Sequence, residues 1–308
     1  MRRGTPSGPD QRARLVFVIP AGLLGVLLAW ALSDVPVDAT VRFGADMAGA
    51  AVLGLAALPR LDGRFEVPWR MLAALAGLWC CLEFGVLIFA AGEVVGTGVG
   101  GLGPADFGTY LARISGGQIG VAILLGTAAV AGYAALAYRL PRQRTPDLVL
   151  VFAAVTVTLR PITGHMSQQA FGSMLAGVHA LAASMWLGLL LALALVVRGR
   201  GGWASALPRY SAIAMPMVAA IAVTGVLNGL IRVGGITPFF TTGYGRIMVA
   251  KTLLLVVLLV LGWWWRRTWV VAAGGHRISA EGSLRRAVLE VSVMATAFGL
   301  AASLAISG

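Results

Sequence analysis

Two of the three histidines in this chain lie close together in an apolar stretch, RPITGHMSQQAFGSMLAGVHALAASMWLG, at residues 160–188. His165 is followed directly by Met166, and His179 lies further along the same stretch. Neutral imidazole nitrogen and thioether sulfur are donors that suit copper. The pattern predicts a copper site formed by His165, His179 and Met166. It favours Cu(I) over Cu(II), because these neutral donors need no thiolate or carboxylate beside them.

Two other interpretations of these residues stay open. Histidines also join helices through hydrogen bonds, and methionine is an ordinary filler of apolar helices, so the group could be purely structural. Two imidazoles in a helical bundle can also ligate a haem iron axially. The chain would then be a membrane haem-binding or electron-transfer protein.

The composition shows which elements must position these residues. The chain has 308 residues, 58% of them hydrophobic and only 12% charged, whereas soluble domains carry roughly 25% charged residues. Apolar runs of about 20 residues recur along it, and a backbone in lipid must satisfy its own hydrogen bonds. We therefore expect an all-α, polytopic membrane bundle forming one integral membrane domain over residues 1–308. The nine expected spans, or eight if one is missed or two merge, cover residues 15–33, 41–59, 70–92, 114–138, 147–163, 172–197, 211–233, 246–265 and 285–306.

The basic residues set the orientation of the bundle. Most of the 24 lysines and arginines fall in alternate gaps between the apolar runs, which places those gaps and the N-terminus in the cytoplasm. The same placement explains the net charge of +12 as a topology signal, so no nucleic acid partner is expected. The first run is long for a signal peptide, and we expect an uncleaved helix. The basic gap after residue 265 is expected to lie on the membrane surface. No phosphate-binding loop motif occurs, which argues against ATP-driven transport by this chain alone.

Costly polar residues inside spans usually face the bundle interior and mark a site or a pathway. Most of them lie towards the outer ends of their spans; these are Asp46, Glu83, Gln118, Arg160, His165, His179, Asn228, Arg232 and Lys251. Helical spacing places several on shared faces, such as His179 with Trp186 and Tyr244 with Lys251. We predict an outward-opening cavity around the metal ligands, lined or supported by Glu83, Asn228, Tyr244, Lys251, Trp186 and Asp46. Glu290 is the exception, about one turn from the cytoplasmic side.

Each of these groups also has a simpler interpretation. Outer arginines such as Arg160 can extend to lipid headgroups, and Asp46 can pair with Arg42 one turn earlier. Asn228 can join helices by hydrogen bonds. Lys251 is the only lysine in the chain, and Glu83 is a candidate partner for its charge.

Two adjacent cysteines, Cys80 and Cys81, lie near the middle of their span. They are a candidate relay that passes Cu(I) inward from the outer site. The alternative is that they are small buried apolar residues, and no disulfide between neighbours is expected.

The stretch GHMSQQAFGSMLAGVHALAASMWLGLLLAL resembles the copper resistance protein D family of bacterial inner-membrane proteins. The likeness rests on a GH pair at Gly164 and His165, then on His179 followed by Trp186 and Gly188. A second block, RYSAIAMPMVAAIAVTGVLNGLIRVGGITPFFTTGYGRIMVAKTLLL, is also similar to the family, as is the last helix, LRRAVLEVSVMATAFGL. The resemblance covers roughly residues 155–306, whereas residues 1–145 match only in hydropathy.

The resemblance implies a multi-pass protein of the bacterial inner membrane that is not an enzyme. It implies copper transport or handling, with import from the periplasm to the cytoplasm. The implied partners are copper ion, the lipid bilayer, and a periplasmic copper-binding protein or a cytochrome oxidase assembly factor. A copper chaperone for oxidase assembly, without transport, is the alternative within the same chemistry.

Overall fold

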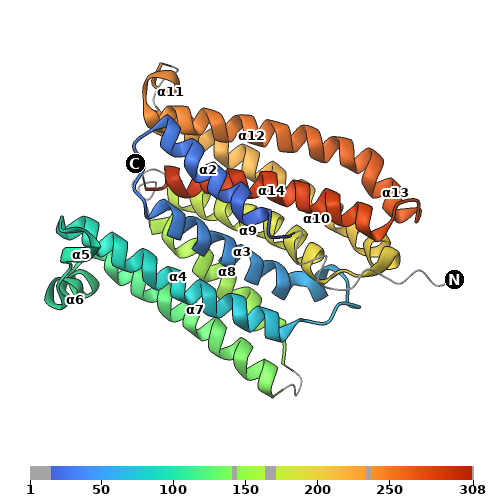
Figure 1. Ribbon diagram of the computed structural model, residues 1–308, viewed down its shortest axis with the longest axis horizontal. Coiled ribbons are helices and arrows are strands. Elements are labelled where there is room, and N and C mark those ends of the chain that lie inside the picture. Colours follow the sequence, from blue (N-terminus) through green and yellow to red (C-terminus); the bar gives the residue numbers. More distant parts are fainter. Residues whose placement is uncertain (1–14, 141–143, 164–170, 234–236, 307–308) are drawn as a thin grey trace.

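The computed structural model describes residues 15–140, 144–163, 171–233 and 237–306, without the side chains of 230–233. Within these residues all regular structure is helical, and eight helices are long and apolar enough to cross a membrane (Figure 1). The predicted all-α membrane bundle is confirmed, with a shorter apolar helix, α2, where the first of nine spans was expected. The helices are α2 (Val18–Leu32), α3 (Ala39–Leu61), α4 (Trp69–Val95), α5 (Gly98–Gly101), α6 (Pro104–Arg113), α7 (Ser115–Arg139), α8 (Pro146–Thr163), α9 (Gly172–Val196), α10 (Gly199–Val233), α11 (Pro238–Thr241), α12 (Gly243–Trp265), the π-helix η2 (Arg266–Val270), α13 (Val271–Gly274) and α14 (Ala280–Leu304).

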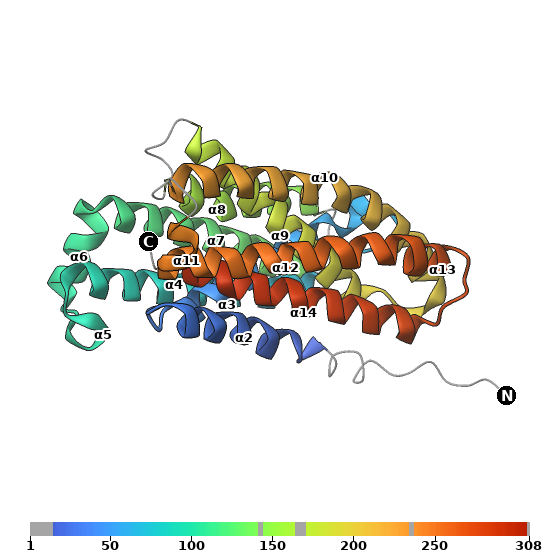
Figure 2. The same ribbon diagram turned by 90° about the horizontal axis from the view of Figure 1, so that it is seen from above.

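The centre of the bundle is formed by α3, α9 and α14, whose side chains are the most buried of the long helices. Helices α4, α7 and α8 pack on one side of this centre, and α2 and α12 pack against α14 on the other. Helix α10 lies against α9 and contacts α12 (Figures 1 and 2). The arrangement places α9, α10 and α12 together, so polar residues on these three helices can share one site.

Glycines allow two pairs of helices to touch backbone to backbone. A Cβ added at Gly188 on α9 would collide with the carbonyl oxygen of Ala50 on α3, and one added at Gly54 would collide with that of Gly188. Helices α2 and α14 meet in the same way at Gly25 and Gly299. Small residues at crossing points are how helices in lipid gain close van der Waals packing. Gly188, two residues after Trp186, therefore belongs to the α3–α9 crossing.

The two ends of the bundle differ in chemistry. Helices α5, α6 and α11 lie at one end, and α13 lies at the other (Figure 2). At the α13 end, the nearly buried carboxylate of Asp62 is bonded by Arg64 at 2.8 Å and by Arg209 at 2.7 Å. The hydrogen bonds from Arg64, aided by Arg209, hold the pKa of Asp62 well below its usual 3.8. The distribution of basic residues predicts that this arginine-rich end lies in the cytoplasm.

Three helices at the inner end extend beyond the apolar runs that predicted them. Helix α10 begins at Gly199 rather than near 211, and α14 begins at Ala280, where Ser279 caps its first turn. Helix α12 continues through η2 and α13 to Gly274, so most of the expected surface segment extends this helix. Polar helical turns outside the lipid have no hydropathy signal, because water satisfies their side chains there. The rings of Trp265 and Trp269, 5.4 Å apart, anchor this extension.

Candidate functional site

His179 lies on α9, about 10 Å along the helix from its outer end at Gly172. Its Nδ1 is 2.9 Å from the hydroxyl oxygen of Thr224 on α10. That hydroxyl donates its single proton to the carbonyl oxygen of Ala220, at 2.6 Å. When the hydroxyl proton points to Ala220, Thr224 accepts from Nδ1 of His179, and that tautomer leaves a lone pair on Nε2. An imidazole oriented in this way is prepared to bind a metal through Nε2.

The face of α10 next to His179 carries glycines that let other side chains approach. The His179 ring lies 3.5 Å from where a Cβ on Gly225 would stand. One turn further out, the Met248 sulfur of α12 lies 3.2 Å from the corresponding position at Gly229. Residues four apart on a helix are separated by about 6 Å along its axis. An imidazole and a thioether therefore rest on neighbouring turns of the same helix.

Asn228 lies between these two glycines in sequence, one turn beyond Thr224 on α10. Its Oδ1 is buried, and no described residue donates a hydrogen bond to it. A buried acceptor without a donor costs about 1–3 kcal/mol, and a cation is one partner that would satisfy its lone pairs. The region thus combines the donors of His179, Asn228 and Met248, one from each of three helices.

Lys251 of α12 is the charged neighbour of this group. It is partly buried and lies within electrostatic range of His179. Within the described residues it forms no ion pair, because Glu83, its predicted partner, is bound elsewhere. A positive charge beside the site opposes the binding of another cation, and it opposes a dication twice as strongly as a monocation. Tyr244, two turns before Lys251, begins the same helix face.

Glu83 and Asp46 belong to a second polar group, on α3, α4 and α8. Glu83 is 5% exposed, accepts a hydrogen bond from the indole of Trp79 at 3.1 Å, and forms an ion pair with Arg160 of α8. Asp46 pairs with Arg42 at 3.7 Å, as the spacing predicts. Arg160 is therefore held inside the protein by Glu83 rather than extended to headgroups. The two acidic groups are matched by two arginines, so this group is balanced without a metal.

The remaining predicted site residues are placed as follows. Trp186 is buried on α9, and its carbonyl oxygen accepts a hydrogen bond of 3.4 Å from Tyr210. Cys80 is partly buried and Cys81 is exposed on α4, which packs mainly against α3 and α7, so the structure does not bring the cysteines to the His179 group. His165 and Met166 fall outside the described residues, as does the side chain of Arg232.

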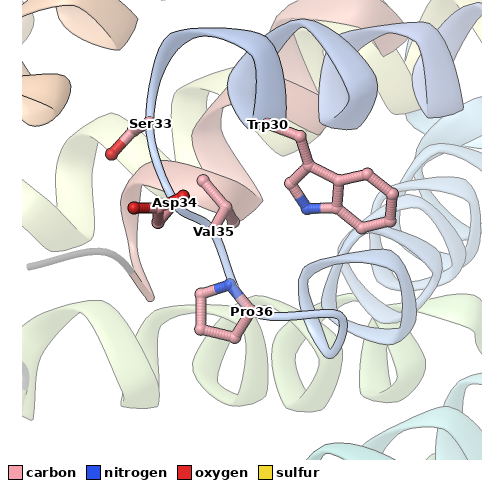
Figure 3. A pocket seen from close by; sticks show the side chains of 5 residues that line it. All are labelled: Trp30, Ser33, Asp34, Val35 and Pro36. Atoms are coloured by element: carbon pink, nitrogen blue, oxygen red, sulfur yellow. The ribbon is translucent and has the colours of Figure 1, made fainter.

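Surface pockets lie away from this group. Trp30, Ser33, Asp34, Val35 and Pro36 line one at the loop between α2 and α3 (Figure 3). A neighbouring pocket adds Gly243 and Arg246 from the start of α12. Neither is lined by His179, Asn228 or Met248. No set of three His, Cys, Asp or Glu side chains within the described ranges is close enough to hold a metal. Any metal bound among these residues would depend on neutral donors.

A comparison with protein families gives the chain its relation to known proteins. Residues 204–304 match the family model "Copper resistance protein D". This part of the chain is a CopD domain. This match and the eight long apolar helices show a multi-pass membrane protein that contains a CopD domain, consistent with the bacterial inner membrane. Comparison with curated proteins and with solved structures gave no match.

The CopD domain includes Thr224, Asn228, Met248 and Lys251, but it begins after His179, Trp186 and Gly188. The role of His179 therefore rests on its geometry. Met248 was not selected as a ligand from the sequence. Its spacing of one turn from Tyr244 was the available signal.

Proposed function

We propose that this protein carries copper across the inner membrane from the periplasm to the cytoplasm, with His179 as the ligand inside the bundle. Copper enters at the outer end, where His165 and Met166 receive it. It then passes to Nε2 of His179, with Met248 and Asn228 as further donors. The protein acts as a carrier and catalyses no covalent reaction.

One observation carries this proposal: Nδ1 of His179 lies 2.9 Å from the Thr224 hydroxyl, and Nε2 is the ring nitrogen that this hydrogen bond does not use. The unpartnered Oδ1 of Asn228 and the Met248 thioether support it from the neighbouring turns of α10 and from α12. The CopD domain supports copper as the metal. Lys251 supports Cu(I), because its positive charge opposes a monocation less than a dication.

The binding step is tested on purified protein by competing for Cu(I) with a chromophoric chelator. His179→Ala is expected to lower the affinity at least tenfold, while His276→Ala at the opposite end leaves it unchanged. Lys251→Gln is expected to raise the affinity, because it removes the repelling charge. An unchanged affinity in His179→Ala would rule out this site. A haem Soret band in the purified protein would instead support a haem-binding role.

Transport itself is tested in proteoliposomes that contain a Cu(I) indicator inside. Wild-type protein is expected to load the vesicles with copper, and His179→Ala is expected to fail. Copper binding without uptake would contradict the transport proposal. It would support a chaperone that passes copper to a partner such as an oxidase assembly factor.

A further inference from the structure

Arg266 and Arg267 lie at the inner end of α12, away from the proposed copper site. They begin η2, the single π-helical turn of Arg266–Val270 that joins α12 to α13. Such turns are rare and are frequently found at functional sites. Helix α12 runs along the edge of the bundle (Figure 1), and its apolar window has the lowest buried share of the eight long helices. Lipid rather than protein therefore surrounds most of this helix.

The length of α12 places both arginines at the level of the lipid headgroups. The helix has 23 residues, from Gly243 to Trp265, which span about 35 Å at 1.5 Å per residue. The hydrocarbon core of a bilayer is about 30 Å thick. With Gly243 at the outer boundary of this core, Arg266 and Arg267 lie just beyond the inner boundary, where the phosphate groups of lipids are.

The exposed face of α12 changes from aliphatic to aromatic to basic along the helix. Four side chains on this face are between 49% and 61% exposed: Val256, Val260, Trp263 and Trp264. Spacings of three and four residues place them on one side of the helix, and Arg267 follows Trp263 by one turn. Tryptophans gather where hydrocarbon meets the headgroups. The order of side chains on this face therefore matches the layers of one leaflet.

The guanidinium group of Arg267 is turned back towards the hydrocarbon. Its Cζ lies 4.2 Å from the centre of the Trp263 ring, four residues earlier on the helix. An arginine that only seeks water extends its charge away from the bilayer. Stacking uses the flat face of a guanidinium and leaves the N–H groups at its edge for an acceptor. Arg267 forms no ion pair with the other described residues.

Arg266 reaches across to the neighbouring helix. Its Nη1 donates a hydrogen bond of 3.4 Å to the carbonyl oxygen of Ser211 on α10. That bond uses one of the five N–H donors of a guanidinium group. Like Arg267, it forms no ion pair within the described ranges. Two consecutive cations are thus held at the membrane boundary by neutral partners, one of them at the contact between α10 and η2.

The phosphate of an anionic phospholipid fits both the charge and the depth of this pair. Guanidinium groups bind phosphate oxygens through paired N–H donors. Basic sites between helices on the cytoplasmic side of a membrane are known to bind lipid headgroups. A lipid would also cover the exposed side chains of Val260 and Trp263 with its acyl chains, which a soluble anion cannot do. A zwitterionic headgroup fits less well, because its ammonium group is repelled by the second arginine.

We propose that Arg266 and Arg267 bind the phosphate of an anionic phospholipid of the inner leaflet, with the acyl chains along the face of α12 that carries Val260 and Trp263. The phosphate accepts hydrogen bonds from both guanidinium groups, and it lies beside Ser211 of α10. The bound lipid joins the inner ends of α10 and α12. This site does not depend on the proposed copper function.

The site is tested by titrating dioleoyl phosphatidylglycerol into the full-length protein in a neutral detergent and counting bound lipid by native mass spectrometry. The wild type is expected to bind one phosphatidylglycerol more tightly than dioleoyl phosphatidylcholine, which has the same chains and phosphate. Each basic residue near a membrane surface gains roughly fivefold in affinity for anionic lipid. Replacing both residues, Arg266→Gln with Arg267→Gln, should therefore weaken phosphatidylglycerol binding about thirtyfold. The control, Arg70→Gln with Arg139→Gln, removes the same charge from exposed positions on α4 and α7 and should keep the wild-type affinity.

A lysine variant separates a shaped phosphate site from general attraction between opposite charges. Arg266→Lys with Arg267→Lys keeps both charges but loses the flat, paired donors, so it is expected to bind phosphatidylglycerol more weakly than the wild type. Equal binding by this variant and the wild type would overturn the inference, as would equal losses in the glutamine variant and its control. Equal affinity for the two lipids would also overturn it. Displacement of phosphatidylglycerol by inorganic phosphate would assign the arginines to a soluble anion instead.

Discussion

Replacing Thr224 with valine tests how His179 is prepared for a metal. Valine keeps the branched shape of threonine but removes the hydroxyl oxygen that lies 2.9 Å from Nδ1. Thr224 is only 5% exposed, so water does not readily replace that oxygen. Without this acceptor the ring is free to rotate or to move its proton to Nε2, where the metal should bind.

The expected loss follows from the contacts that remain. Removing the group that orients a histidine ligand usually lowers metal affinity 10–100-fold, or about 1.4–2.7 kcal/mol. The backbone of Ile221 is a second acceptor within reach of the imidazole and retains part of its orientation. We therefore expect Thr224→Val to weaken Cu(I) binding about tenfold, the lower end of that range.

The assay is competition for Cu(I) against a chromophoric chelator, with two matched variants. Thr224→Ser retains a hydroxyl and should restore affinity close to that of the wild type. Thr158→Val removes a threonine hydroxyl that bonds only to its own helix, at 2.8 Å, and should have no effect. The reasoning is refuted if Thr224→Val binds copper as tightly as the wild type, or if both valine variants lose affinity equally.

Three further predictions concern stability, each measured by unfolding in detergent micelles. Glu83→Gln should cost about 3 kcal/mol, because it leaves Arg160 partly buried without its counter-charge, whereas Glu93→Gln at an exposed position should cost little; equal effects would show that the ion pair is not maintained. Gly188→Leu should separate α3 from α9 and lower the unfolding temperature sharply, whereas Gly132→Leu, with no atom within 4 Å of its added Cβ, should be tolerated. Asp62→Asn should destabilise the protein at neutral pH and should flatten its loss of stability at low pH. The folded pKa of Asp62 lies below its usual 3.8, so the stability it provides is present above that value and is lost as pH falls further. A wild type and an Asp62→Asn variant with the same acid profile would contradict this reasoning.

Hydropathy predicted most of the architecture, because a spanning helix must be apolar where it meets lipid. The apolar runs predicted the long helices, whereas the orientation inferred from the arginines stays a prediction. The inner extensions of α10, α12 and α14 were missed because helical turns in water are not apolar.

The partners of polar residues could not be predicted, because they depend on which helices become neighbours. Thr224 is 45 residues from His179, and Arg160 is 77 residues from Glu83. The sequence indicated that polar residues such as His179 and Glu83 lie at a similar depth in their spans. It did not indicate which helices pack together and so which of these residues make contact. Helix α4 was placed against α3 and α7, which separated Glu83 and the cysteines from His179. Local pairs, such as Arg42 with Asp46, were predictable from helix periodicity alone.

The contact between α2 and α14 has a consequence for how the protein is made. Thr296 of α14 donates a hydrogen bond to the carbonyl oxygen of Ala21 in α2. The first and last described helices are therefore joined by residues that lie 275 positions apart in the sequence. During synthesis α2 enters the bilayer long before α14 is made. Gly25, which contacts α14 in the finished protein, has no helix packed on it until then. Residues 204–304, the CopD domain, include α14, whose packing partners α2 and α3 lie outside that range. A chain truncated before α14 would leave the faces of α2 and α3 that pack on α14 exposed to lipid. Such a chain should be degraded by membrane quality control rather than accumulate.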